Sequence, residues 1–360
     1  MGYTALYRKF RPLNFSEMVG QEHITRTLRN QVIEQRVGHA YLFNGGRGTG
    51  KTSAAKILAR AVNCLNPKDG EPCNECEICK AILSGSLTDV VEMDAASNNS
   101  VEDIRAIRDE VNFLPTRAKY RVYIIDEVHM LSIGAFNALL KILEEPPKGT
   151  IFILCTTDPQ KIPATILSRV QRFDFKRIPT QKIMERLIYI IDKENTEREQ
   201  GIEYTEDALR YIAQLANGGM RDAITKLDTV LGYSHHITVS SVTQCLGLVS
   251  LSFQLEVIEN ILQKDMNRVL ESIDAIYYDG KDLKLFIKDL VQTTLEVIKY
   301  TLNHNVYNLP EAAKSRVTQI STTHASKLVE LLDNFTKLYN DIKYEQHPKF
   351  LIESELIQLC

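Results

Sequence analysis

Nine consecutive residues near the start of the chain have the types and spacing needed to hold a triphosphate. They run Gly45-Gly46-Arg47-Gly48-Thr49-Gly50-Lys51-Thr52-Ser53. Glycines let backbone N–H groups curl around phosphate oxygens, and a helix that begins at the lysine adds partial positive charge there. We therefore predict an ATP site in which Lys51 reaches the β- and γ-phosphates and Thr52 binds Mg²⁺. A glycine-rich turn without a ligand is the alternative.

A pair of carboxylates, Asp126 and Glu127, follows four apolar residues at 122–125. Such a strand can bring its acidic end to the same phosphates. Asp126 is then expected to complete the Mg²⁺ shell, and Glu127 to orient or deprotonate the attacking water. Adjacent carboxylates after a strand are also common on surfaces, but together with the glycine-rich loop they predict hydrolysis rather than binding alone.

Four of the seven cysteines lie within 16 residues, at Cys64, Cys73, Cys76 and Cys79. Close-spaced thiolates can occupy the corners of a tetrahedron around Zn²⁺. An iron–sulfur cluster is the main alternative, but Lys80 follows the last cysteine where the ferredoxin pattern continues differently. Because protein fills all four corners, we expect a structural zinc module at 64–79 rather than a catalytic metal.

The elements that must carry these residues alternate between short β-rich runs and helical patterns, which predicts an α/β fold with a doubly wound parallel sheet. The runs at 122–125 and 151–154 are apolar throughout, as expected of strands covered on both faces. Helical patterns follow from residue 180, so an all-α region completes the chain. The expected strands cover 39–44, 89–93, 121–126, 151–156 and 170–175. The expected domains are 1–178, 179–245 and 246–360.

Bulk composition is that of a globular protein, with 360 residues, 44% hydrophobic, 25% charged and a net charge of -3. No apolar run approaches the roughly 20 residues needed to span a bilayer. Charges interrupt the first ten residues, so we expect no export signal and a cytoplasmic location. The last helical pattern has no terminator, which suggests that the chain is part of a longer protein. Residues 1–60 carry ten Lys and Arg against three Asp and Glu, which suits phosphates but also an ordinary solvated face.

With these motifs the sequence resembles the AAA+ clamp-loader ATPases, and among them the gamma/tau family of bacterial DNA polymerase III. The resemblance is dense through about residue 245 and thin beyond it. It rests on the loop, the cysteines and Asp126-Glu127, and on the segments 7–12, 15, 19–21, 92–97, 128–131, 136–147, 156–161, 168–169 and 218–223.

The resemblance implies roles for three further polar residues. Thr157, with Thr156 beside it, would sense the γ-phosphate. Arg221 would reach the same phosphate from a helical lid at 179–245. Arg169 would be an arginine finger for the neighbouring subunit's ATP, although the family's usual Ser-Arg-Cys ends here in Val170.

The resemblance also assigns the adenosine part of the nucleotide to the N-terminal segment. Tyr7, Arg11, Pro12 and Val19 would pack around adenine and ribose; an arm that is merely attached to the domain is the alternative. For DNA the resemblance points to the inner face of the first domain. There Arg105, Lys141 and Lys161 could meet phosphates without reading base sequence.

The implied function is that of the ATPase motor subunit of the DNA polymerase III clamp loader, which opens the sliding clamp and loads it onto primed template DNA. The implied partners are delta, delta-prime and further gamma/tau copies in a hetero-oligomeric ring, with 246–360 as its helical collar. The holoenzyme is a nucleotidyltransferase, but no polymerase chemistry is expected of this chain. Two alternatives are a standalone AAA+ DNA motor, such as a branch-migration helicase, and an ATP-binding scaffold without turnover.

Overall fold

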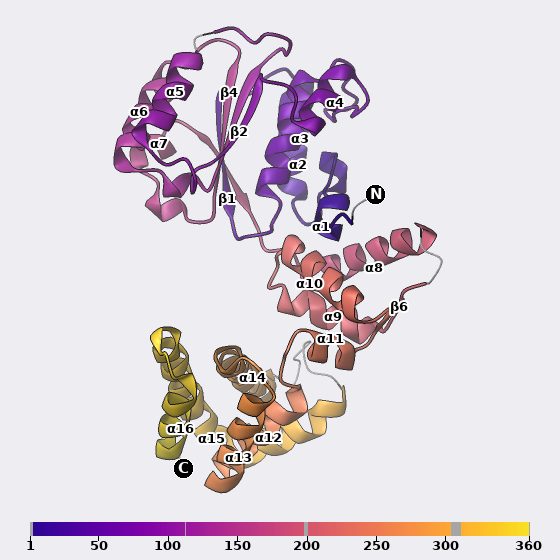
Figure 1. Cartoon of the computed structure of the whole chain (residues 1–360), viewed down its shortest axis with the longest axis vertical. Coiled ribbons are helices and arrows are strands. Elements are labelled where there is room, and N and C mark those ends of the chain that lie inside the picture. Colours follow the sequence, from indigo (N-terminus) through magenta and orange to yellow (C-terminus); the bar gives the residue numbers. More distant parts are fainter. Residues whose placement is uncertain (1–2, 112, 198–200, 304–310, 360) are drawn as a thin grey trace. The chain divides into compact units, whose positions relative to one another are not determined.

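The structure is a computed structural model that describes residues 3–111, 113–197, 201–303 and 311–359, without the side chains of 303, 311–312 and 321–326. The chain divides into two compact units, Met1–Ile237 and Thr238–Cys360 (Figure 1). The domain boundaries predicted at 178/179 and 245/246 remain predictions.

A five-stranded parallel sheet forms the centre of the first unit, with the strand order β2-β3-β4-β1-β5. Each predicted strand is present to within one residue of its expected ends. β1 lies between β4 and β5, so the glycine-rich loop that follows β1 leaves the sheet next to its edge strand β5. The strands are β1 (Ala40–Gly45), β2 (Val90–Asp94), β3 (Arg121–Asp126), β4 (Thr150–Thr156) and β5 (Gln171–Phe175).

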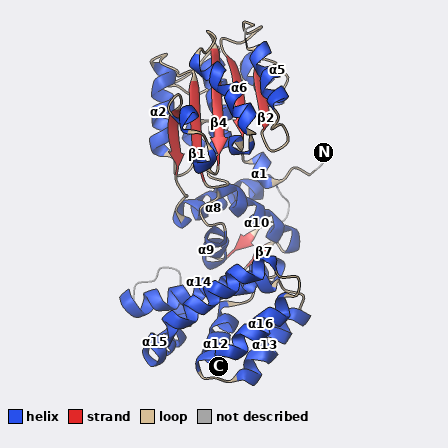
Figure 2. Ribbon diagram, turned by 90° about the vertical axis from the view of Figure 1, so that its left-hand side faces the viewer, coloured by secondary structure: helices blue, strands red, loops and turns tan. Residues whose placement is uncertain are grey.

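Helices cover both faces of this sheet (Figures 1 and 2). Alternate residues of a strand point to opposite faces, so Phe43 packs with one helix layer and Leu42 with the other. All seven residues of β4 are buried. The rings of Tyr123 and Phe152 stack with centroids 5.2 Å apart. The predicted doubly wound α/β fold is therefore confirmed.

Helices α2 and α3 lie on one face of the sheet, and α5, α6 and α7 on the other (Figure 1). Side-chain caps determine where two of these helices begin: Ser100 and Asp103 form a capping box at α5, and Ser132 caps α6. The helices here are α1 (Leu6–Lys9), η1 (Phe15–Glu17), α2 (Glu22–Ile33), α3 (Lys51–Asn63), α4 (Glu77–Ser84), α5 (Val101–Glu110), η2 (Val128–Met130), α6 (Ile133–Glu144), η3 (Pro159–Lys161) and α7 (Ala164–Leu167).

Three helices from the segment predicted to form a lid follow β5 within the same unit, and we call them the lid helices: α8 (Thr180–Glu197), α9 (Glu206–Leu215) and α10 (Met220–Tyr233). Their apolar faces bury Leu187, Ile212 and Leu227. A two-stranded parallel ladder joins β6 (Glu203–Tyr204) to β7 (His236–Ile237). The sequence did not predict this ladder, because two-residue strands are too short to show an alternating pattern.

The second unit is helical, as the sequence predicted, and has its own apolar core. Ile258, Leu290 and Phe335 are among its fully buried residues. Arg316 joins two of its helices through a bidentate pair with Glu259, with Nε 3.0 Å from Oε1 and Nη2 2.6 Å from Oε2. The helices are α11 (Val239–Cys245), α12 (Leu251–Leu262), α13 (Met266–Tyr278), α14 (Leu283–Asn303), α15 (Glu311–Asp341), η4 (Ile342–Tyr344) and α16 (Pro348–Leu359).

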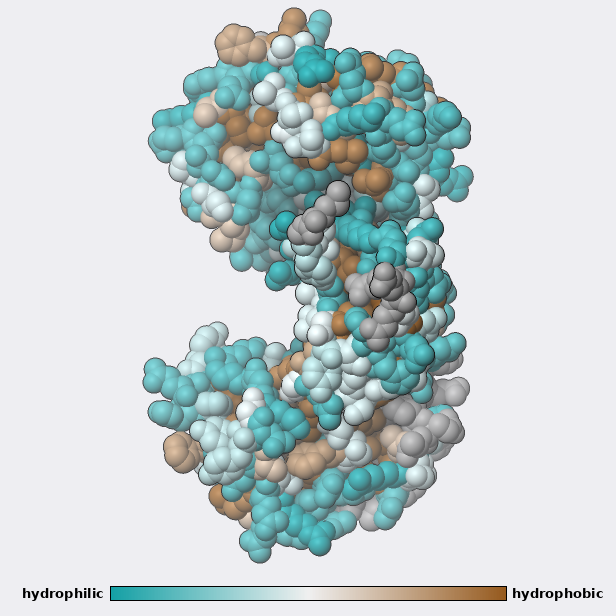
Figure 3. Space-filling model, turned by 45° about the vertical axis from the view of Figure 1, so that its right-hand side comes forward, coloured by the Kyte–Doolittle hydropathy of each residue, from teal (hydrophilic) through white to brown (hydrophobic). Residues whose placement is uncertain are grey.

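The visible surface is mixed in character. Figure 3 shows hydrophobic residues in small groups among hydrophilic ones on the face in view. Among the described residues, no helix combines the length and apolarity required to cross a bilayer.

Candidate functional site

The glycine-rich loop joins β1 to α3 and needs glycine for two different reasons. Gly48 and Gly50 have φ of 73° and 105°, which side chains disfavour. At Gly45 a Cβ would lie 2.4 Å from the carbonyl oxygen of Phe175 in β5. The loop is thereby held close to the sheet edge, with its backbone free to face a ligand.

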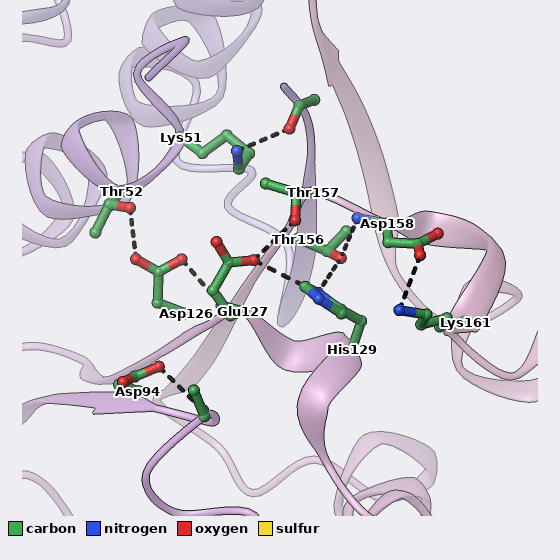
Figure 4. Close-up of polar contacts among 12 residues, drawn as sticks. Lys51, Thr52, Asp94, Asp126, Glu127, His129, Thr156, Thr157, Asp158 and Lys161 are labelled. Atoms are coloured by element: carbon green, nitrogen blue, oxygen red, sulfur yellow. Dashed lines mark hydrogen bonds and ion pairs between the residues drawn. The ribbon is translucent and has the colours of Figure 1, made fainter. Parts of the chain in front are cut away.

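Lys51 begins α3 and is only 6% exposed. Its Nζ donates to the carbonyl oxygens of Gly45 and Gly46, both at 2.8 Å (Figure 4). Burial lowers the pKa of Lys51, and the carboxylates of Glu127 and Asp126 oppose that shift. The Nζ of Lys51 is thus already directed into the loop.

A cavity of about 930 Å³ opens beside the loop, a volume suited to a nucleotide-sized ligand. Most of the residues predicted to bind nucleotide line it, together with the acidic Glu92 and Asp94, which were not predicted. Gly45 and Gly46, both predicted to bind nucleotide, do not line it. The predicted residues in the lining are Tyr7, Arg11, Pro12, Val19, Arg47, Gly48, Thr49, Gly50, Lys51, Thr52, Ser53, Asp126, Glu127 and Arg221.

The two predicted magnesium ligands lie together at this cavity. Thr52 Oγ1 donates to Asp126 Oδ2 at 2.7 Å, and the other oxygen of Asp126 accepts from the Glu127 amide at 3.0 Å (Figure 4). Hydroxyl and carboxylate oxygens are the ligands that Mg²⁺ prefers. The donor set therefore fits the predicted ion.

Glu127 sits in a left-handed backbone conformation, with φ of 48°, at the turn after β3. Thr157 Oγ1 donates to Glu127 Oε2 at 3.1 Å (Figure 4). The Nδ1 of His129 lies 3.4 Å from the same oxygen and 3.0 Å from Thr156 Oγ1. Thr157 follows β4, which pairs with β3, so the sheet itself brings the two side chains together. His129 lies in the segment 128–131 that carries the resemblance, but sequence reasoning assigned it no role of its own.

The lid contacts the loop directly. Gly48 O accepts a hydrogen bond from the Met220 amide at 2.9 Å. Arg221 places its guanidinium carbon 4.8 Å from the ring centre of Tyr7, so both predicted residues share one wall of the cavity. The sequence placed Arg221 near phosphate but gave no sign of its contact with Tyr7.

Gln21 is a second residue that sequence reasoning left without a role. It is fully buried, and its side-chain amide both donates to Lys176 O at 2.7 Å and accepts from Lys176 N at 3.1 Å. Lys176 lies between β5 and α8. Gln21 therefore ties the segment beside the cavity to the connection that leads into the lid.

Arg169 lies away from this cavity. Its guanidinium contacts Glu144 Oε1 at 2.8 Å and Thr165 O at 2.7 Å. It borders a separate hollow of about 550 Å³ with His39 and Gln171. The structure thus does not bring Arg169 to Lys51 of the same chain, and its role toward a neighbouring subunit stays a prediction.

The three basic residues predicted to meet DNA are distributed over separate short helices of the first unit. Arg105 lies on α5, 3.8 Å from Glu102, and Lys161 lies in η3, 3.3 Å from Asp158. Lys141 lies on α6. Ser100 caps α5: its Oγ accepts from the Asp103 amide at 3.2 Å and donates to the Asp103 carboxylate at 2.8 Å.

The four clustered cysteines do come together. Their sulfur atoms all lie within 4.8 Å of one another. A tetrahedron with metal–sulfur bonds of about 2.3 Å has corners about 3.8 Å apart, so the group fits a four-coordinate ion. Backbone amides of Cys73, Cys76 and Cys79 donate to the preceding cysteine sulfur at 3.3 to 3.4 Å. Such bonds favour thiolates, the form that binds metal.

Two family models match this chain. Residues 20–179 match "DNA polymerase III, delta subunit", and residues 237–360 match "DNA polymerase III subunits gamma and tau domain III". The Thermotoga maritima RuvB Holliday junction branch migration motor aligns with 74% of this chain and 85% of that one, at 18% identity and a TM-score of 0.47.

Two of the curated relatives match over the whole length of the chain. The DNA polymerase III subunit tau of Bacillus subtilis is 46% identical over 364 residues, which cover 100% of this chain and 64% of the relative. The chain thus spans less than two thirds of that protein. The DNA polymerase III subunit gamma of Buchnera aphidicola is 40% identical over 365 residues, with 100% and 99% covered. The chain therefore belongs to the gamma/tau family of DNA polymerase III subunits.

Proposed function

We propose that this chain is the ATP-hydrolysing motor subunit of a DNA polymerase III clamp loader. The observation that carries the proposal is the meeting of Lys51, the Thr52–Asp126 pair and Glu127 at one cavity. Basic, metal-binding and water-activating groups are the three parts that phosphoryl transfer to water needs.

The chain's own groups divide the work on ATP. Lys51 exchanges its carbonyl partners for the β- and γ-phosphate oxygens, and the loop amides bind the remaining phosphate oxygens. Thr52 and Asp126 would hold Mg²⁺, which would neutralise charge that develops on the phosphates. Glu127 accepts a proton from the attacking water, while Thr157 holds its carboxylate in position.

In the assembled ring, a neighbouring subunit supplies each ATP site with an arginine that the site's own chain does not provide. Arg169 faces away from its own cavity and is offered to the ATP of a neighbouring subunit, so that hydrolysis depends on the ring. Arg221 contacts Tyr7 and lies in the first turn of α10. It therefore links the γ-phosphate to the angle of the lid. Delta, delta-prime and further gamma/tau copies complete the ring in the cytoplasm, with residues 246–360 as the collar.

The four-cysteine cluster is proposed to hold structural Zn²⁺. Four protein ligands leave no open position for a substrate. The domain organisation proposed with it is a nucleotide-binding domain at 1–178, a lid at 179–245 and the collar. Primed template DNA is proposed to bind at Arg105, Lys141 and Lys161. The sliding clamp is what the assembled complex loads onto this DNA.

Replacing the catalytic carboxylate tests the hydrolytic role. Glu127→Gln should keep the affinity for Mg·ATP within about threefold and lower turnover at least about 100-fold, the usual contribution of a general base. Glu206→Gln, an exposed glutamate on α9, is the matched control. Equal turnover in Glu127→Gln and the parent would instead indicate a scaffold that binds ATP without using it.

Reconstitution separates the loader from a branch-migration motor. The chain is combined with delta, delta-prime and the clamp, and ATP turnover is measured with primed circular DNA and with a four-way junction. Stimulation by primed DNA only when clamp is present is expected. Stimulation by the junction without clamp would support the motor and contradict the proposal.

A further inference from the structure

The N-terminal segment lines the nucleotide cavity twice, before and after the short stretch 13–16, whose own residues do not line it. Arg11 and Pro12 line the cavity before this stretch, and Met18 and Val19 line it afterwards. The intervening residues 13–16 contact the loop that carries the four cysteines. The position of the cavity wall therefore depends on how that loop is held.

Glu71, in the cysteine loop, holds this stretch by its backbone. Its two carboxylate oxygens accept the amides of Phe15 at 2.7 Å and Ser16 at 2.9 Å. Arg29 of α2 approaches the same carboxylate at 3.6 Å. The side chain is 15% exposed, so these charge-assisted bonds are partly shielded from water. Reciprocal backbone hydrogen bonds with Lys68, at 2.8 and 3.1 Å, fix the backbone of Glu71 itself.

Arg60 makes a second connection from α3, the helix that Lys51 begins. It is 3% exposed, and its guanidinium donates to Leu13 O at 2.8 Å and to Asn74 Oδ1 at 3.0 Å. Asn74 lies between two of the cysteines and has a positive φ of 59°. One buried cation thus joins the cysteine loop, the N-terminal stretch and the phosphate-loop helix.

Both connecting residues belong to the loop that the cysteines close. Glu71 precedes Cys73 by two residues, and Asn74 follows it directly. A bound metal restricts such a loop by fixing its ends, and its binding energy contributes to the folded form of the loop. Without the metal, the thiols alone hold Glu71 and Asn74 less firmly.

We propose that the cysteine module is a positioning brace for the adenosine part of the nucleotide. Through Glu71 and the Arg60–Asn74 contact, it holds residues 13–16 so that Arg11, Pro12 and Val19 face the cavity. The inference rests on the proposed nucleotide site, and it adds that metal occupancy and nucleotide affinity are coupled. Because the coupling is one of binding free energies, it acts in both directions.

The test compares Glu71→Ala with Glu75→Ala, an exposed glutamate of the same loop, in the full chain. Mg·ADP and inorganic tripolyphosphate are titrated by calorimetry, and zinc per chain is measured by its release. Glu71→Ala should weaken Mg·ADP about 5- to 20-fold, as expected on loss of two charge-assisted bonds, with zinc content unchanged. Tripolyphosphate affinity should stay within about twofold, because the phosphate loop is not part of the brace.

Removing zinc from the parent with a chelator should weaken Mg·ADP by a similar factor. The same treatment of Glu71→Ala should weaken Mg·ADP by a clearly smaller factor, since the mutation and the loss of zinc act on one connection. If Glu71→Ala does not fold, Asn74→Gly removes one of the two partners named for Arg60 while keeping the positive φ, and should weaken Mg·ADP about two- to fivefold.

The outcomes separate the two proposals. A parent chain that binds neither ADP nor tripolyphosphate contradicts the nucleotide site itself. A parent that binds ADP, with Glu71→Ala, Asn74→Gly and the zinc-free protein all within twofold of it, overturns the brace alone. Equal losses for ADP and tripolyphosphate also overturn it, because they indicate general damage to the fold.

Discussion

The hydroxyl of Thr52 and the carboxylate of Asp126 are joined by a 2.7 Å hydrogen bond, although they come from α3 and β3. The parallel sheet explains this meeting, since β4 alone separates β1, which leads into α3, from β3. The fold itself thus places the two predicted Mg²⁺ ligands side by side.

Asp126→Asn should remove most of the effect of Mg²⁺ on nucleotide binding. The amide keeps an oxygen for Thr52 but lacks the charge that a divalent cation requires. ATP affinity with Mg²⁺ should fall at least about tenfold, and affinity in a chelator should change less than about threefold. Calorimetry measures both. Asp158→Asn, which alters a carboxylate paired with Lys161 instead, should behave like the parent.

Thr157→Val should separate turnover from binding. Valine has the shape of threonine but cannot donate to Glu127, whose carboxylate then loses its bond of 3.1 Å. Steady-state turnover should fall about 10- to 100-fold while the dissociation constant of Mg·ATP stays within about threefold. Thr165→Val, at an exposed position of α7, is the control. A loss of affinity equal to the loss of turnover would assign Thr157 to binding instead.

Arg169→Ala should be silent in the isolated chain and severe in the assembled loader. Its pair with Glu144 is partly exposed and is worth at most about 1 kcal/mol of folding stability. Turnover in the reconstituted ring should fall on the order of 10³-fold, as expected for an arginine finger. Glu144→Gln breaks the same pair but keeps the arginine, so the ring should retain its turnover. Clamp loading by Arg169→Ala at the parental rate would show that the finger lies elsewhere.

The stability of the second unit should depend on pH through Asp289. Burial raises the pKa of this carboxyl to about 6, against the smaller opposing effect of Lys288. An unfolded Asp titrates near about 3.9, so between about pH 4 and pH 6 the folded chain holds more protons. The free energy of unfolding should therefore fall as the pH rises through that window.

Asp289→Asn should flatten this dependence and stabilise the protein by roughly 1–2 kcal/mol at about pH 7. Urea unfolding at about pH 4.5 and about pH 7 measures both effects. Asp341→Asn, an exposed position on α15, should leave the slope intact. An unchanged slope in Asp289→Asn would place the titrating group at another residue.

The sequence predicted the parts of the site that follow local rules. Strands buried on both faces appear as apolar runs, so β3 and β4 were located to within one residue. The spacing of the glycines around Lys51 and of the four cysteines follows directly from phosphate and metal geometry. Those motifs needed no knowledge of distant contacts.

The remaining contacts depend on single side chains that meet across large sequence separations. Glu71 binds the amide of Phe15 from 56 residues away, and Gln21 binds Lys176 from 155 residues away. A lone glutamate or glutamine carries no periodic pattern, so its partner cannot be chosen before the fold is known. The Arg221–Tyr7 contact escaped prediction for the same reason.

The turn before α10 has a consequence for how the family can vary. Asn217 and Gly218 both have positive φ, a Cβ at Gly218 would lie 2.6 Å from Arg177 Cβ, and one at Gly219 would lie 3.0 Å from Arg47 O. The next amide bonds to Gly48 O. Insertion or deletion of even one residue here would displace the lid relative to the glycine-rich loop. This turn should therefore have a constant length among family members, while neighbouring surface loops vary in length.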